Sequence, residues 1–326
     1  MTTAASASSA PSRLIDLAVE WPLQYAEEST AIDAADYPGV RARLGQVDGY
    51  LSTTLAAIVW IGPAPGDRPD PWGEVSRLFA GVEAEFSGRI LADPADLNRF
   101  TSEPDDTMTW AVVGLRGLAT LLHTDDARDR LAALIDRGVR AMRLAGLVDC
   151  PIDPARDRGL TDPERSAIAT IASASSGRPL LLDLAGLPLT AAGEVLGLVE
   201  AGEQGNVVPI VSLGGVMGGL RPEDAQRVRA LGGVIGLSPA RALFPTAESF
   251  GNALDEAAGL LGADLDAVAI GTGFLGIDEP IEGLANAPDL LHWLFSRFPP
   301  QPAKSVTREN ALARIFRMLI SPRESV

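Results

Sequence analysis

The chain has 326 residues, 46% of them hydrophobic, so it is long enough to bury a sizeable core as one large α/β barrel or two modest domains. Its formal net charge of -16 argues against a nucleic-acid partner, because such proteins present a basic face. A solvated acidic surface that favours solubility explains this charge more simply. Its single lysine, Lys304, lies in a proline-rich segment, which argues against Schiff-base chemistry at a strand end.

The cysteine content and the N-terminal residues predict the cellular compartment of the protein. Cys150 is the one cysteine of the sequence, so no disulfide forms within the chain and a reducing compartment fits. Residues 1–12, MTTAASASSAPS, lack the basic and apolar regions of a secretory signal and are expected to form a disordered tail. No apolar run approaches the length of a membrane span. We therefore expect a cytoplasmic protein without a membrane partner.

Eight short apolar runs follow one another along the chain, each closed by a polar or glycine-rich turn. The strands they predict are residues 14–19, 55–61, 109–115, 140–144, 180–184, 207–213, 233–237 and 267–270. Most of these runs are apolar throughout, whereas a sheet with one solvated face would alternate. Such runs are typical of strands covered on both faces by helices in a parallel sheet.

Helical patterns separate most of these strands. The expected helices are residues 71–86, 125–137, 164–174 behind a capping box of Thr161 and Glu164, one with Thr190 as its N-cap, 222–231, 246–261, 289–298 and 308–320. Eight strands alternating with helices predict an α/β fold, a single-domain (β/α)8 TIM barrel over residues 13–326. A doubly wound open sheet is the competitor, but the early glycine-rich phosphate loop of such folds is missing.

The chemistry of parallel barrels lies at the C-terminal ends of the strands. Polar residues at these ends are Asp16, Glu20, Trp21, Arg116, Arg143, Asp183, Ser212, Ser238 and Thr272. Arg116 and Arg143 could bind a small anionic or zwitterionic ligand, or they could neutralise the carboxylates inside the barrel mouth. Glu20 and Asp183 could likewise carry out acid–base chemistry, or they could anchor backbone N–H groups. Both pairs of interpretations stay open at this point.

Two histidines limit the metal and nucleophile chemistry that is possible. A His-rich zinc site needs more than His123 and His292. We expect His123 at the surface or at a helix cap, and we expect His292 to pack among its apolar neighbours. Neither Ser212 nor Ser238 lies in a Gly-x-Ser-x-Gly context, so a Ser-His-Asp triad is not indicated.

A series of short motifs keeps one order over nearly the whole chain after the tail. These motifs are IDLAVEWP at 15–22, VGLRG at 113–117, GVRAMRLAG at 138–146, GLT at 159–161, LDLAG at 182–186, IVSL at 210–213, GGVIG at 232–236, GTGFLG at 271–276, EGL at 282–284 and NALARI at 310–315. Their order and spacing resemble the renal (membrane) dipeptidase family of zinc peptidases, peptidase family M19, which are (β/α)8 barrels. The resemblance implies the same fold and a possible homodimer.

The same resemblance implies where a dizinc site would lie. In the family two zinc ions are held by a His and an Asp of the first motif, a bridging Glu and two strand-end histidines. These positions fall at Ala18, Glu20, Arg116, Gly186 and Leu213. The histidine near the reacting carbonyl falls at Gly146, the acid–base Asp at Gly273 and the carboxylate-binding Arg at Met217. Glu20 alone keeps a ligand atom, so we expect zinc, the family's cofactor, to be lost.

The divergent motif positions lead to three interpretations of function. The first is a pseudoenzyme with a degraded dizinc site, in which Arg116 pairs with Glu20 and the barrel serves as a binding or partner scaffold. The second is a working hydrolase on a dipeptide-like or small anionic substrate, with non-zinc chemistry rebuilt from Glu20, Asp183 and Arg143. The third is a binding protein that holds a ligand carboxylate on Arg116 or Arg143. Partnership predicts a filled mouth and an exposed apolar patch, whereas binding or catalysis predicts an open polar pocket.

Overall fold

The computed structural model of the chain describes residues 13–20, 49–63, 69–102, 108–146, 156–203, 206–214, 220–262, 265–274, 279–316 and 319. The predicted tail, Trp21, Cys150 and Met217 lie outside the described residues.

Eight strands form one parallel sheet that closes on itself. They are β1 (Leu14–Val19), β2 (Thr54–Ile61), β3 (Trp110–Leu115), β4 (Val139–Arg143), β5 (Leu180–Asp183), β6 (Val207–Ile210), β7 (Ile235–Leu237) and β8 (Val268–Ile270). The order in the sheet is β6-β5-β4-β3-β2-β1-β8-β7, and an isolated bridge between Val211 and Ile235 brings the two edges together. The prediction of eight strands in a (β/α)8 barrel is confirmed, with boundaries that differ by no more than three residues.

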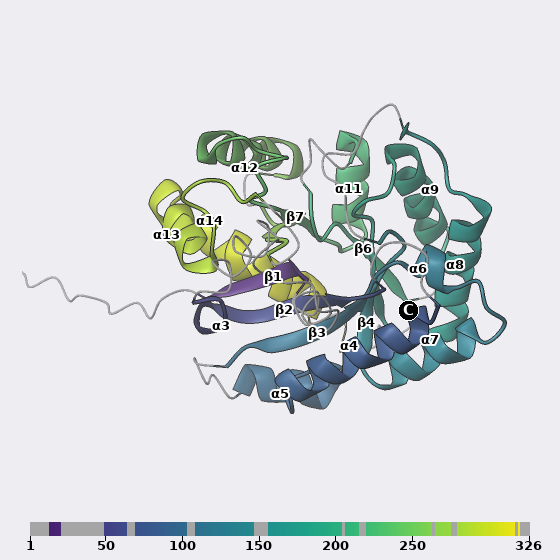
Figure 1. Cartoon of the computed structure of the whole chain (residues 1–326). Helices are drawn as coiled ribbons and strands as arrows, with labels where there is room; N and C mark the ends of the chain where they lie inside the picture. Colours follow the sequence, from purple (N-terminus) through teal and green to yellow (C-terminus); the bar gives the residue numbers. More distant parts are fainter. Residues whose placement is uncertain are drawn as a thin grey trace, which may run out of the picture.

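Helices surround the strands on all sides of the view in Figure 1. They are α3 (Tyr50–Thr53), α4 (Pro71–Glu85), α5 (Pro94–Ser102), α6 (Leu118–Leu121), α7 (Ala127–Asp136), α8 (Asp162–Ala174), α9 (Leu189–Glu200), α11 (Pro222–Ala230), α12 (Ala247–Leu261), α13 (Ala287–Arg297) and α14 (Pro300–Lys304). Each main helix buries one apolar stripe, as Val75, Phe79 and Val82 do in α4. None of the helices in the described ranges combines the length and the apolar character that crossing a bilayer requires.

The helix boundaries test the capping predictions. The capping box of α8 is confirmed, because Thr161 accepts a hydrogen bond from the Glu164 N–H and Glu164 accepts one from the Thr161 N–H. The prediction for Thr190 is wrong, because α9 begins at Leu189 and its N-cap is Pro188. The Thr190 N–H instead donates to Asp157, at 2.8 Å, so a carboxylate from a distant loop satisfies this helix end.

The predicted environment is correct for one of the two histidines and wrong for the other. His123 is exposed, as expected. The prediction that His292 packs is wrong, because its side chain is exposed on α13 while Leu291 and Leu294 are buried. Helical periodicity points a residue between apolar neighbours outward when it falls off the apolar stripe.

The C-terminal segment lies at the N-terminal end of the barrel. An α-helix was expected over residues 308–320, but the chain forms two π-helical turns, η2 (Ser305–Glu309) and η3 (Leu312–Phe316). The Asn310 amide donates to the carbonyls of Leu265 and Val268 at the start of β8, and Phe316 stacks on Phe100 with ring centroids 6.2 Å apart. These two anchors hold the segment against the start of β8 and against α5.

Arginine side chains connect neighbouring helices around the barrel. The pairs are Arg137–Glu83 between α7 and α4, Arg165–Glu194 between α8 and α9, Arg227–Glu200 between α11 and α9, and Arg297–Asp255 between α13 and α12. Each pair is partly solvated, so it contributes about 1 kcal/mol or less. The abundance of arginine in this acidic chain is thus partly explained by contacts between helices.

Candidate functional site

Four charged side chains converge at the C-terminal ends of neighbouring strands. Glu20 follows β1, Arg116 follows β3, Arg143 ends β4 and Asp183 ends β5. All four are buried, with exposed fractions of 5%, 1%, 0% and 0%. We call these four residues the mouth network. Buried charges require partners, and the contacts within this network supply them.

Arg143 is the centre of the mouth network. Its Nε donates to Asp183 Oδ2 at 2.6 Å, its Nη1 donates to Glu20 Oε1 at 3.1 Å, and its Nη2 donates to Ser212 Oγ at 2.8 Å. Its guanidinium carbon also lies 4.1 Å from the centroid of the Trp60 ring, within the range of a cation–π contact. All three nitrogens of this buried cation are therefore engaged.

Arg116 is the second arginine that donates a hydrogen bond to Glu20. Its Nε donates to Glu20 Oε2 at 2.9 Å, and its Nη1 donates to the Pro63 carbonyl at 3.1 Å. Each oxygen of the Glu20 carboxylate thus accepts from a different arginine. The pairing of Arg116 with Glu20 that the sequence suggested is present.

Asp183 acts as an anchor between two strand ends. Its Oδ1 accepts the backbone N–H groups of Ser212 and Ala185, at 2.8 and 3.1 Å. Its Oδ2 accepts from Arg143 and from the Ser212 hydroxyl. Asp183 and Glu20 are therefore held on either side of Arg143, and the structure supports the anchoring interpretation of Asp183 over a pair of facing carboxylates.

Glycines make room for these large side chains. A Cβ atom at Gly62 would lie 2.5 Å from Cγ of Arg116, and one at Gly114 would lie 2.6 Å from Cε3 of Trp60. A Cβ at Gly271 would lie 1.6 Å from the Ser212 carbonyl oxygen, which belongs to the backbone and cannot move aside easily. Trp60 and these glycines could not be recognised from the sequence, because no local pattern indicates what lies across a barrel.

A second buried carboxylate, Asp16, lies in β1 apart from the arginines. It accepts from the Ala18 N–H (3.0 Å), the Thr272 N–H (2.8 Å), the Thr272 hydroxyl (2.6 Å) and the Tyr50 hydroxyl (2.8 Å). Burial raises the pKa of Asp16 from 3.8 to about 6, although these hydrogen bonds act in the opposite direction. Burial also raises the pKa of Tyr50 well above its usual value, so that its hydroxyl stays protonated.

The residues at the motif positions do not fit a dizinc centre. Ala18 and Leu213 are buried aliphatic residues, and Gly186 and Gly273 lack side chains altogether. Within the described ranges, no group of three or more His, Cys, Asp or Glu residues is placed to hold a metal ion. Glu20 has a carboxylate, but both of its oxygens accept from arginines. Zinc sites need several converging N, O or S ligands, which these positions do not offer.

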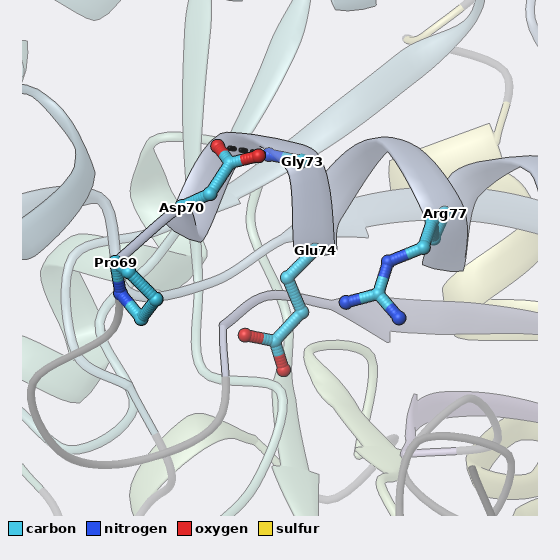
Figure 2. Close-up of a pocket in the computed structure, with 5 residues that line it drawn as sticks. All are labelled: Pro69, Asp70, Gly73, Glu74 and Arg77. Atoms are coloured by element: carbon cyan, nitrogen blue, oxygen red, sulfur yellow. Dashed lines mark hydrogen bonds between the residues drawn. The ribbon is translucent and has the colours of Figure 1, made fainter. Parts of the chain in front are cut away.

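A pocket of about 460 Å³ lies elsewhere, on the first turns of α4. Figure 2 shows its lining residues Pro69, Asp70, Gly73, Glu74 and Arg77, with Glu74 and Arg77 extending from the same side of the helix. The Asp70 carboxylate accepts the Gly73 N–H and so caps the helix. No member of the mouth network lines this pocket.

Comparison with known structures defines the class of fold. Neither a family model nor a curated relative matches the sequence. A metallo peptidase from Rhodobacter sphaeroides, solved with a phosphinate mimic of the dipeptide L-Ala-D-Ala, is similar in structure, with a TM-score of 0.65 at 15% identity over 95% of this chain and 99% of that chain. The probable dipeptidase PvdM from Pseudomonas aeruginosa gives a TM-score of 0.64 at 14% identity over 94% of each chain.

A dipeptidase of peptidase family M19 gives a TM-score of 0.65 at 15% identity, over 95% of this chain and 98% of that chain. At these identities the likeness establishes the fold and not the activity. The chain therefore has the barrel fold of the M19 dipeptidases, which confirms the fold expected from the motif order.

Proposed function

We propose that this chain is a dipeptidase-fold barrel that does not hydrolyse dipeptides and that acts as a binding or partner scaffold. The observation that supports this proposal most strongly is the double pairing of Glu20 with Arg116 and Arg143, at 2.9 and 3.1 Å. The one motif position that keeps a metal-ligating side chain is thereby occupied by two cations of the chain itself.

Electrostatics disfavour zinc at this position. A metal ion bound to Glu20 would have to displace two guanidinium groups and would then lie close to both positive charges. The displaced arginines are buried, so they would lose their partners in a region of low dielectric. Ala18, Gly186 and Leu213 add no ligands that could compensate. We therefore include loss of the dizinc centre in the proposal.

The balance of charge in the mouth network also bears on ligand binding. Two arginines and two carboxylates cancel one another, so the network needs neither a bound cation nor a bound anion. A ligand carboxylate on Arg143 would have to compete with Asp183, Glu20 and Ser212 for its nitrogens. Of the two arginines, Arg116 is the better site for such a ligand, since it donates to one carboxylate oxygen and one carbonyl, fewer groups than Arg143 contacts.

The alternative of a working hydrolase with non-zinc chemistry is less well supported by the contacts of Glu20 and Asp183. A general base needs a lone pair directed at its substrate, but Glu20 and Asp183 both accept from arginine. Ser212 is fully buried, and its hydroxyl lies between Asp183 and Arg143. No imidazole joins it, since His123 and His292 are exposed. The described part of the mouth thus lacks an accessible nucleophile with a neighbouring base that is not paired with an arginine.

The surface constrains the kind of partner. Met108 is the one large hydrophobic side chain that is exposed among the described residues, at 38%. The exposed apolar patch that partnership predicted is therefore not found among the described residues, although the filled mouth is. Any partner surface on this part of the chain is polar or charged, and the net charge of -16 favours a partner with basic groups. We include a cytoplasmic location and a homodimer in the proposal, as the sequence suggested.

Peptidase activity tests the proposal. Hydrolysis of L-Ala-D-Ala is measured for the full chain with and without added zinc, beside a Glu20→Gln variant. We expect no turnover above the rate in buffer for either protein. Zinc-dependent turnover that Glu20→Gln abolishes would contradict the proposal, because it would show that Glu20 serves a metal rather than two arginines.

A further inference from the structure

The two arginines of the mouth network differ in how fully their nitrogens are used. All three guanidinium nitrogens of Arg143 donate to side chains of the mouth. Arg116 uses Nε for Glu20 and Nη1 for the Pro63 carbonyl, and its Nη2 has no acceptor among the described residues. Because each terminal nitrogen of a guanidinium carries two N–H groups, donors remain on the Nη1–Nη2 edge of Arg116.

This edge belongs to a buried and fixed side chain. Arg116 is 1% exposed, and its contacts at 2.9 Å to Glu20 and 3.1 Å to the Pro63 carbonyl set the plane of its guanidinium. Buried polar groups in folded proteins nearly always have a partner. Since the described part of the chain supplies none for Nη2, its partner must come from solvent, as water or as an anion.

The described residues leave space at this corner of the mouth. A Cβ atom at Gly117, which follows Arg116, would lie 3.6 Å from Cδ of Pro63 and 3.9 Å from Cα of Gly146. A Cβ atom at Gly146 would meet nothing within 4 Å beyond its chain neighbours, and Pro63 and Gly146 are both partly exposed. The mouth network thus fills the centre of the mouth, whereas the corner beside Arg116 has room for a small group.

We propose that the Nη1–Nη2 edge of Arg116 binds a small monocarboxylate, with both carboxylate oxygens accepting from the guanidinium. This inference rests on the proposed function, since it names the chemical class that the scaffold binds in its mouth. The site differs from the carboxylate site that the family resemblance implies, because the carboxylate-binding Arg of that family falls at Met217.

Charge and shape select a monocarboxylate over a dianion. The two arginines and two carboxylates of the mouth network cancel, so each negative charge of a ligand is added to a neutral site. Glu20 lies 2.9 Å from Nε of the same guanidinium, so a dianion would meet a like charge at short range. The guanidinium fork also matches the two coplanar oxygens of a carboxylate. We therefore expect acetate to bind about tenfold more tightly than sulfate.

Titration of the full chain with acetate tests the inference, followed through the side-chain nitrogen-15 resonances of Arg116. Acetamide is the neutral analogue of the same shape, and sulfate is the dianion. We expect saturable shifts with acetate, with a dissociation constant of about 1–10 mM for so small a ligand, and none with acetamide. Arg116→Lys keeps the charge but not the fork and should weaken binding about tenfold, whereas Arg178→Lys on the surface should leave it unchanged.

The resonances of Arg116 in the unmodified protein decide the question even if Arg116→Lys does not fold. The inference would be overturned by acetate shifts that do not saturate, that acetamide reproduces or that sulfate matches in affinity; water would then be the partner of this edge. Zinc-dependent hydrolysis of L-Ala-D-Ala would contradict the proposed function and, with it, this inference. Failure of acetate to bind a protein without such turnover would overturn this inference alone.

Discussion

Arg143 and Glu20 are separated by 123 residues in the sequence and meet in a hydrogen bond of 3.1 Å at the mouth of the barrel. The bond joins the end of β4 to the end of β1, with β2 and β3 between them in the sheet. Asp183 and Arg116 extend this contact on either side. The mouth is thus held together by side chains of the chain itself, and the predictions below follow from that arrangement.

Removal of the central cation should destabilise the barrel strongly. Arg143→Met leaves the buried Asp183 carboxylate without its cation and leaves Glu20 paired with Arg116 alone, which costs about 3–5 kcal/mol. Arg178→Met removes a surface pair with Asp136 and should cost less than about 1 kcal/mol. Urea denaturation of both variants measures the difference. Equal, small losses would show that the mouth network adds little to stability.

A change of charge at position 116 should not rebuild a zinc site. Arg116→Glu restores the residue type that the dipeptidase family has at this position, but Ala18, Gly186 and Leu213 still supply no ligands. We expect no high-affinity zinc binding by calorimetry, together with a loss of stability because Glu20 would face a like charge. Tight zinc binding by this variant would refute the picture of a site that has lost its ligands.

Gly271 should tolerate no side chain. In Gly271→Ala the new Cβ would lie 1.6 Å from the Ser212 carbonyl oxygen, so β6 and β8 would have to move apart. We expect a loss of about 3 kcal/mol or more, or failure to fold. Gly259→Ala is the matched control, because it lies inside α12 with open space around it, and it should stabilise the protein by up to about 1 kcal/mol. A near-neutral result for Gly271→Ala in thermal or urea denaturation would contradict this close approach.

Protonation of Asp16 should make the protein more stable at acidic pH than at neutral pH. Its pKa in the folded protein, about 6, lies above the ordinary 3.8, so its stabilising contribution is fully present below pH 3.8 and is lost as the pH rises through 6. The free energy of unfolding of the unmodified protein, minus that of Asp16→Asn, should fall by roughly 2–3 kcal/mol from pH 4 to pH 7. An opposite slope would mean that the ionised form is the one that the fold favours.

The Glu164 carboxylate changes stability with pH in the opposite direction to Asp16, and it does so in a more acidic pH range. The pKa of Glu164 is lowered, because hydrogen bonds from Arg158 and Thr161 outweigh the effect of burial. Its stabilising contribution is therefore lost as the pH falls below about 4. This contribution is common to the unmodified protein and Asp16→Asn, so it cancels in the comparison and leaves the effect of Asp16.

The sequence predicted the strands well because their signal is local. Runs such as Leu55–Ile61 are apolar throughout, and glycine or polar residues follow them directly. The C-terminal segment is helical as predicted but π-helical over Ser305–Glu309 and Leu312–Phe316, and we have no physical account of that register. Thr190 was predicted wrongly because a distant group, Asp157, satisfies the end of this helix. Propensity and capping rules do not include such long-range partners.

The candidate site was predicted in part. All four members of the mouth network were identified as strand-end residues, and the Arg116–Glu20 pair was suggested by the resemblance to the dipeptidase motifs. The central position of Arg143 and its stacking on Trp60 were not predicted, since they depend on the register of four strands. The hydrogen bonds of Asp16 were likewise hidden, because they depend on Tyr50 and Thr272, which lie 34 and 256 residues away.

The metal content of the purified protein, after equilibration with excess zinc and exhaustive dialysis, tests the central claim most directly. If Glu20 is held by Arg116 and Arg143 in place of a metal centre, zinc should be far below one equivalent per chain, and Arg143→Met should not raise it. Near-stoichiometric zinc in the unmodified protein would contradict the account and would place a working metal centre in this barrel.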